Sequence, residues 1–115
     1  MNPSWLKIKK QVLGEKYDLS VCFLGNAEMK RLNVVYRKKN YAPNVLSFAL
    51  SETDGEVLIN KKYQKNDAGT YLFVHSLLHL SGLKHGLQME KKELKMMKKL
   101  YPQNHQKIMS GIHNS

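Results

Sequence analysis

One stretch of apolar residues interrupted by three histidines constrains this chain more than any other feature. Residues 70–86 read TYLFVHSLLHLSGLKHG, with His75 and His79 four residues apart. On an α-helix, residues four apart lie on one face, about one turn from each other. A glycine ends a helix readily, because it adopts the left-handed conformation that turns the chain back. A turn at Gly82 is therefore predicted to bring His85 over the two helical histidines.

Three imidazoles that converge on one point, with a fourth position left for water, are typical of a catalytic zinc site. The helix that carries the first two of them is predicted over residues 67–81 and is apolar around most of its circumference. A buried imidazole needs a polar partner, and the sequence places few acids nearby. Histidines hydrogen-bonded within an apolar core are the alternative interpretation. We assign one Zn²⁺ per chain to His75, His79 and His85.

The spacing H-x3-H-x2-G-x2-H is also the metal-ligand part of the metzincin signature. In zinc peptidases of this kind the residue after the first histidine is a glutamate, which acts as general base. Here that residue is Ser76, and a serine cannot take the proton from a metal-bound water. A zinc-dependent peptidase with a metzincin-like site is therefore an alternative that the sequence disfavours.

Charge indicates the kind of partner. The 115 residues include 19 Lys+Arg and 9 Asp+Glu, a formal net charge of +10, which suits a polyanion such as nucleic acid. No run approaches the roughly 18 apolar residues of a membrane span, and the N-terminus lacks the apolar core of a signal peptide, so no membrane partner is expected. The single cysteine, Cys22, lies in an apolar run and is predicted to be buried, in a cytoplasmic, reducing environment.

Periodicity predicts a single α+β domain over 1–115, with a small mixed sheet of three to four strands packed on the central histidine helix. An amphipathic helix is expected within residues 1–15, and residues 103–115 are expected to form a frayed tail. The other expected elements are strands at 17–24, 44–50 and 56–60, and helices at 27–38, 67–81 and 87–101.

Two blocks of the chain follow patterns that occur together in one protein family. The stretch 75–85, HSLLHLSGLKH, is similar to the family pattern H-G-x-L-H-L-x-G-x-D-H at its histidines, leucines and glycine. The stretch 32–49, LNVVYRKKNYAPNVLSFA, is similar to the block L-N-x-x-Y-R-x-K-D-x-P-T-D-V-L-S-F-P, and the two blocks occur in the family's order. Over roughly residues 20–100 the chain therefore resembles the YbeY family, bacterial zinc-dependent endoribonucleases that mature ribosomal RNA.

The resemblance implies a single-strand-specific, metal-dependent endoribonuclease that acts in 3′-end maturation of small-subunit ribosomal RNA and in ribosome quality control. Its partners would be single-stranded RNA and the ribosome or its small subunit, whereas the oligomeric state is unknown. Arg37 matches the family's essential arginine and is expected to be the catalytic residue that grips the phosphate.

Three further residues are expected to support the site. Ser47 belongs to the strand beside it, Ser76 stands where the family has glycine, and Lys84 stands where an aspartate precedes the third ligand. Asn40 and Asn44 replace two more aspartates. Because these changes remove negative charge near the metal, a non-catalytic, zinc-stabilised RNA- or ribosome-binding module is the second alternative.

The RNA approach is assigned to lysines that flank the site in sequence, namely Lys38, Lys39, Lys61 and Lys62. Tyr36 and Tyr41 are candidates for base stacking. Tyr36 also continues an apolar helical stripe with Val35, however, and is expected to face the core.

Overall fold

A computed structural model describes residues 1–112, in which five α-helices, one short 3-10 turn and a three-stranded sheet form an α+β fold. The predicted fold class is confirmed. In chain order the elements are α1 (Pro3–Leu13), β1 (Asp18–Leu24), α2 (Asn26–Arg37), β2 (Val45–Ala49), β3 (Asp54–Asn60), η1 (Lys61–Tyr63), α3 (Asp67–Leu80), α4 (Leu87–Leu100) and α5 (His105–Ser110). Within residues 1–112 no helix is long and apolar enough to cross a membrane.

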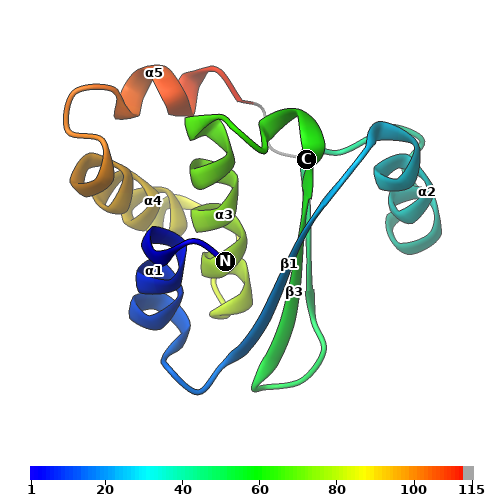
Figure 1. Ribbon diagram of the computed structural model, residues 1–115, viewed down its shortest axis with the longest axis horizontal. Helices are drawn as coiled ribbons and strands as arrows, with labels where there is room; N and C mark the ends of the chain where they lie inside the picture. The colour runs from blue at the N-terminus through cyan, green and yellow to red at the C-terminus, as the bar shows by residue number, and fades with distance from the viewer. Residues whose placement is uncertain (113–115) are drawn as a thin grey trace.

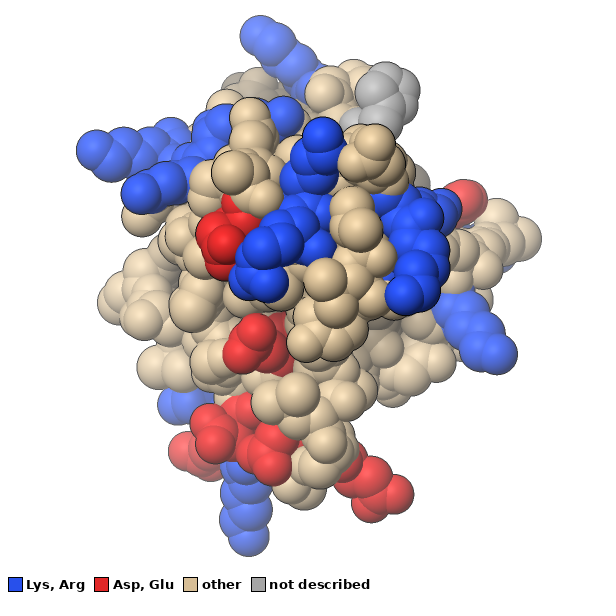
Figure 2. Space-filling model, turned by 90° about the vertical axis from the view of Figure 1, so that its right-hand side faces the viewer, with Lys and Arg blue, Asp and Glu red and all other residues tan. Residues whose placement is uncertain are grey.

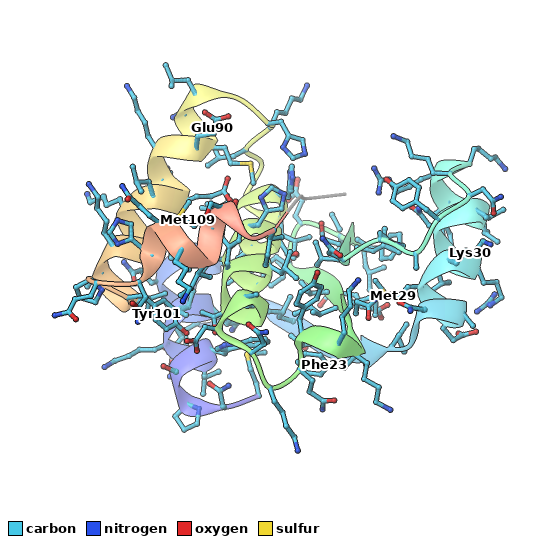
Figure 3. The ribbon with its side chains drawn as sticks, turned by 90° about the horizontal axis from the view of Figure 1, so that it is seen from above. Phe23, Met29, Lys30, Glu90, Tyr101 and Met109 are labelled. Carbon is cyan, nitrogen blue, oxygen red and sulfur yellow. The ribbon has the colours of Figure 1, made fainter. Side chains whose placement is uncertain are left out.

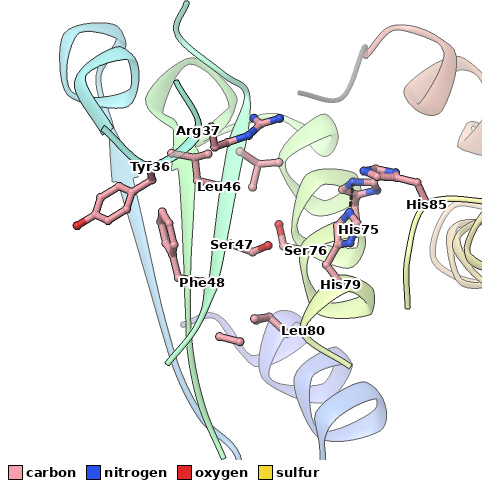
Figure 4. A pocket seen from close by; sticks show the side chains of 12 residues that line it. Tyr36, Arg37, Leu46, Ser47, Phe48, His75, Ser76, His79, Leu80 and His85 are labelled. Atoms are coloured by element: carbon pink, nitrogen blue, oxygen red, sulfur yellow. Dashed lines mark hydrogen bonds between the residues drawn. The ribbon is translucent and has the colours of Figure 1, made fainter. Parts of the chain in front are cut away.

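The sheet is mixed, with strand order β1-β3-β2. The central strand, β3, runs parallel to β1 and antiparallel to β2, so that Val57 pairs with Val21 on one side and with Ser47 on the other. Among the described residues, β2 is therefore an edge strand with β3 as its only neighbour. This edge lies beside the second half of α3, where the histidines are (Figure 4).

Helices cover the two faces of the sheet unequally. Figure 1 shows α2 alone on one side, with α1, α3, α4 and α5 on the other, and Figure 3 shows the same division from above. Side chains of β3 alternate between the faces as strand geometry requires. Val57 and Ile59 join the core around α3, whereas Leu58 packs with Met29 of α2.

Helix α3 is the centre of the larger core. Ten of its residues are buried, from Ala68 to Leu78, which confirms the predicted buried helix. Its N-terminus is capped by Asn66, whose side chain accepts from the Ala68 amide at 2.8 Å. The α1 helix docks on it through Trp5, whose ring stacks on Phe73 with centroids 4.2 Å apart.

The predicted frayed tail is wrong for the part of it that the structure describes. Residues 105–110 form α5, which packs on α3 and α4, and Ile112 beyond it is 9% exposed. Ile108 and Met109 contact the main core, so their burial offsets the entropy of ordering the segment. Residues 113–115 of the predicted tail lie outside the described residues.

Two burial predictions are also wrong, both on the side of the sheet that carries α2. Cys22 is exposed, because its neighbours in β1 point to the α3 side and α2 does not extend over it. Val35 and Tyr36 are exposed as well, since α2 turns Met29 and Asn33 toward the sheet instead. A helix that covers a narrow part of a sheet buries a narrow stripe.

Candidate metal centre

The three predicted ligands meet in one place. Nitrogen atoms of His75, His79 and His85, one from each ring, all lie within 4.8 Å of one another. The Nε2 atoms of His75 and His79 are 3.1 Å apart. Two nitrogens bound tetrahedrally to zinc at about 2.0–2.1 Å would be about 3.3–3.4 Å apart, so the pair lies close to the spacing of two ligands that share a metal.

The end of α3 is built so that His85 returns to the helix. Gly82 has φ +102°, a conformation that L side chains rarely adopt. Its amide donates to the His79 carbonyl at 2.9 Å, and the Leu83 amide donates to the Leu78 carbonyl at 3.1 Å. These two bonds form the Schellman motif that ends many helices. The predicted glycine turn is thus present, and it carries the chain from His79 to His85.

Each helical histidine has an oxygen acceptor at its Nδ1 atom. The Nδ1 of His75 lies 3.1 Å from a carboxylate oxygen of Glu93, and both side chains are almost fully buried. The Nδ1 of His79 lies 3.2 Å from the Leu83 carbonyl oxygen. A carbonyl and a carboxylate can only accept, so Nδ1 carries the proton of each neutral ring and Nε2 keeps its lone pair.

Two lone pairs that face one point repel unless a cation lies between them. The donor set of three imidazoles is the one that zinc takes in catalytic sites, and it also suits copper, iron and nickel. Burial lowers the pKa of His79, and the neighbouring His75 and His85 lower it further. Both effects favour the neutral ring, which is the form that binds a metal. The residues therefore fit a metal ion.

An arginine shares the cleft with this triad. The cleft has a volume of about 400 Å³ and lies between the edge of β2 and α3. Arg37, the last residue of α2, points across it toward the histidines (Figure 4). Asn33, which is fully buried, accepts from Arg37 Nη1 at 3.3 Å and donates to the Tyr41 carbonyl at 2.9 Å. Asn33 thus fastens both Arg37 and the loop after α2.

A family model described as endoribonuclease YbeY matches residues 4–109. The chain belongs to the YbeY family. Similar members are endoribonuclease YbeY of Alkaliphilus metalliredigens, 37% identical over 69% of this chain, and that of Thermodesulfovibrio yellowstonii, 33% identical over 82%. The chain spans 64% and 66% of the lengths of these two relatives. That of Phytoplasma mali is 33% identical over 82% of this chain and 78% of its own length.

Of the three residues expected to support the site, two line the cleft and one does not. Ser47 and Ser76 line the cleft from opposite walls, β2 and α3 (Figure 4). The Oγ atom of Ser76 is buried and has no hydrogen-bond partner among residues 1–112. Lys84 is exposed and does not line the cleft.

The four lysines assigned to RNA are exposed, and none of them lines the cleft itself. Lys38 and Lys39 follow Arg37 directly at the end of α2, whereas Lys61 and Lys62 form the η1 turn after β3. The first pair is thus tied to the cleft by chain connectivity, and the second pair is not.

Sequence reasoning missed Glu93 and Asn33. Glu93 lies between Met89 and Met97 on the buried stripe of α4, each four residues away. Asn33 follows Met29 by four residues on the buried face of α2. A polar residue at an inward position of an amphipathic helix needs a partner, and this signal is visible in the sequence. The sequence places few acids near His75, and Glu93 reaches it from another helix, 18 positions away.

Proposed function

We propose that this chain is a metal-dependent endoribonuclease that cleaves single-stranded RNA. The observation that carries the proposal is one cleft lined by three convergent histidines and an arginine. The net charge of +10 suits a polyanionic substrate, and the similar relatives are named endoribonucleases. We assign zinc as the metal, with His75, His79 and His85 as its ligands, and Arg37 as the catalytic residue.

The roles of the side chains follow from their positions. A bound zinc ion supplies Lewis-acid chemistry, which activates water as a nucleophile near neutral pH. Glu93 holds the proton of His75 on Nδ1, so that Nε2 faces the metal. Arg37 binds a phosphodiester in the cleft and stabilises the negative charge that develops on it. Asn33 keeps the guanidinium pointed into the cleft while the substrate exchanges.

The finer part of the proposal concerns the biological substrate. The YbeY resemblance supports maturation of the 3′ end of small-subunit ribosomal RNA, with the ribosome or its small subunit as partner, and a part in ribosome quality control. The single free cysteine agrees with a cytoplasmic location, where thiols stay reduced. We propose that four lysines guide the RNA, namely Lys38, Lys39, Lys61 and Lys62. Ser47 and Ser76 are proposed to shape the cleft. Lys84 is proposed to influence the neighbouring metal ligand, His85, from outside the cleft.

A direct test combines metal analysis with cleavage assays on single-stranded RNA and on a casein-like peptide, with and without chelator. Metal-dependent RNA cleavage that is lost in His79→Ala is expected. Cleavage of the peptide instead would favour the zinc peptidase. Bound zinc without cleavage of either substrate would favour the non-catalytic, zinc-stabilised RNA- or ribosome-binding module.

The arginine is tested against a matched control on the same helix. Arg37→Ala is expected to abolish RNA cleavage and to leave the zinc content intact. Arg31→Ala removes an exposed arginine that is paired with Glu28 outside the cleft, and it is expected to keep most of the activity. Loss of zinc in Arg37→Ala would mean that the arginine is structural, which would contradict its catalytic assignment.

A further inference from the structure

An aromatic pair lies at one end of the cleft, on the side of β2 away from the metal. Tyr36 is 63% exposed, although its helical position had predicted a core residue. Its ring meets Phe48 edge to face, with centroids 5.2 Å apart and planes at 63°. This contact holds the tyrosine ring in place and leaves much of it open to solvent.

Two pairs of consecutive residues connect this aromatic pair to the metal side. At the end of α2, Arg37 points toward the histidines and Tyr36 points the opposite way (Figure 4). In β2, Ser47 faces α3 and Phe48 packs on the α2 side, as strand alternation requires. All four side chains line the same cleft, which therefore passes around the edge of β2 that faces away from β3.

Basic residues flank Tyr36 along the chain. Lys38 and Lys39 follow Arg37 along the chain, and Lys30 lies on a preceding turn of α2. Figure 2 shows Lys and Arg side chains gathered over the upper part of the side that carries α2, with most of the acidic side chains lower down. An exposed aromatic ring within a basic surface is the combination that binds single-stranded nucleic acid.

We propose that Tyr36, supported by Phe48, is a stacking platform for the nucleobase of a nucleotide next to the phosphate held by Arg37. The proposal rests on the proposed function only in taking RNA as the substrate. Stacking needs an exposed base face, and in a duplex both faces of each base are covered by neighbours. The platform would therefore select single strands without selecting a sequence, since every base has a π face.

The test measures whether Tyr36 binds bases or only backbone. Affinities of the metal-loaded protein are measured by fluorescence anisotropy for a short single-stranded RNA and for an abasic oligonucleotide of equal length and charge. Tyr36→Ala is expected to weaken RNA binding by about 5- to 150-fold, from the usual worth of one base–aromatic stack. Binding of the abasic oligonucleotide is expected to stay unchanged, and Tyr36→Phe is expected to restore RNA binding.

A second tyrosine provides the control. Tyr41 is exposed in the loop after α2 and does not line the cleft, so Tyr41→Ala is expected to bind both oligonucleotides as the wild type does. Equal losses on RNA and abasic oligonucleotide in Tyr36→Ala would overturn the platform, as would no loss on either. Thermal melting of Tyr36→Ala checks that its fold is intact, and denaturing gels check that the bound RNA is uncut.

Cleavage measured in separate, longer incubations of the same protein and RNA separates this proposal from the proposed enzyme. Base-dependent binding through Tyr36 with no cleavage would support the platform and contradict the nuclease. Cleavage with no base-dependent contribution from Tyr36 would support the nuclease and overturn the platform.

Discussion

Of the two faces of the sheet, the one under α3 is closed by a continuous apolar core, whereas the one under α2 is held by a small apolar cluster and buried amides. The larger core contains fully buried side chains such as Phe73 and Leu77. The smaller cluster is Met29, Leu46 and Leu58. Beside it, the buried amide of Asn60 donates to the side chain of Asn26 at 2.7 Å.

The comparison shows that one face of the sheet mainly stabilises the fold, whereas the other mainly orients side chains. Apolar burial is strong but has no direction, and it grows with the area removed from water. A hydrogen bond adds only about 0.5–1.5 kcal/mol net, yet it fixes where two groups point. The α3 side therefore supplies most of the stability and a rigid support for the histidines. On the α2 side, the hydrogen bond that Asn33 accepts from Arg37 fixes where the guanidinium points.

The largest expected effect compares the same substitution on the two faces. Leu77→Ala in α3 is expected to lower the free energy of unfolding by about 4–5 kcal/mol, because a fully buried site in a large core collapses poorly. Leu58→Ala in β3, which faces α2, is expected to cost only about 2–3 kcal/mol. Urea denaturation measures both. Equal costs would break the contrast between the two faces.

The next effect concerns metal affinity on the α3 side. Glu93→Ala removes the acceptor of His75 and is expected to weaken metal binding by about 10- to 100-fold, as loss of such partners does elsewhere. Competition with a chromophoric chelator measures this without reference to activity. Glu90→Ala changes an exposed glutamate of the same helix and is the control. A variant at Glu93 with unchanged metal affinity would show that the buried pair is only structural.

The counterpart on the α2 side is Asn33. Asn33→Ala leaves the Tyr41 carbonyl without its partner and releases Arg37, at a cost of about 1–3 kcal/mol in stability. RNA cleavage is expected to fall while the metal content stays at the wild-type level. Atomic absorption and a cleavage assay on the same preparation measure the two quantities. A joint loss of metal and activity would mean that the two faces are coupled rather than separate.

The smallest effect tests the uncovered part of the α2 side. Cys22 is exposed, so a thiol reagent is expected to label the native protein at a rate close to that of the denatured chain. Cys22→Ser is expected to change stability by less than about 0.5 kcal/mol, as surface substitutions usually do. Slow labelling that speeds up only on denaturation would show that this face is covered in solution.

The sequence by itself determined the features that depend on local spacing. His75 and His79 share a face because they are four residues apart, and Gly82 turns the chain because its backbone tolerates φ +102°. The buried helix and the α+β class follow from apolar periodicity, because the spacing of apolar residues indicates whether a segment forms a helix or a strand.

Only the tertiary structure decided the features that depend on which elements meet. Glu93 reaches His75 because α4 packs on α3, and 18 residues of chain separate the two. Tyr36 and Cys22 are exposed because α2 covers only a narrow part of its face of the sheet. Helix α5 is ordered because its apolar side chains pack against the main core. Periodicity shows that a side chain is apolar or polar, but packing decides how far each covering element extends.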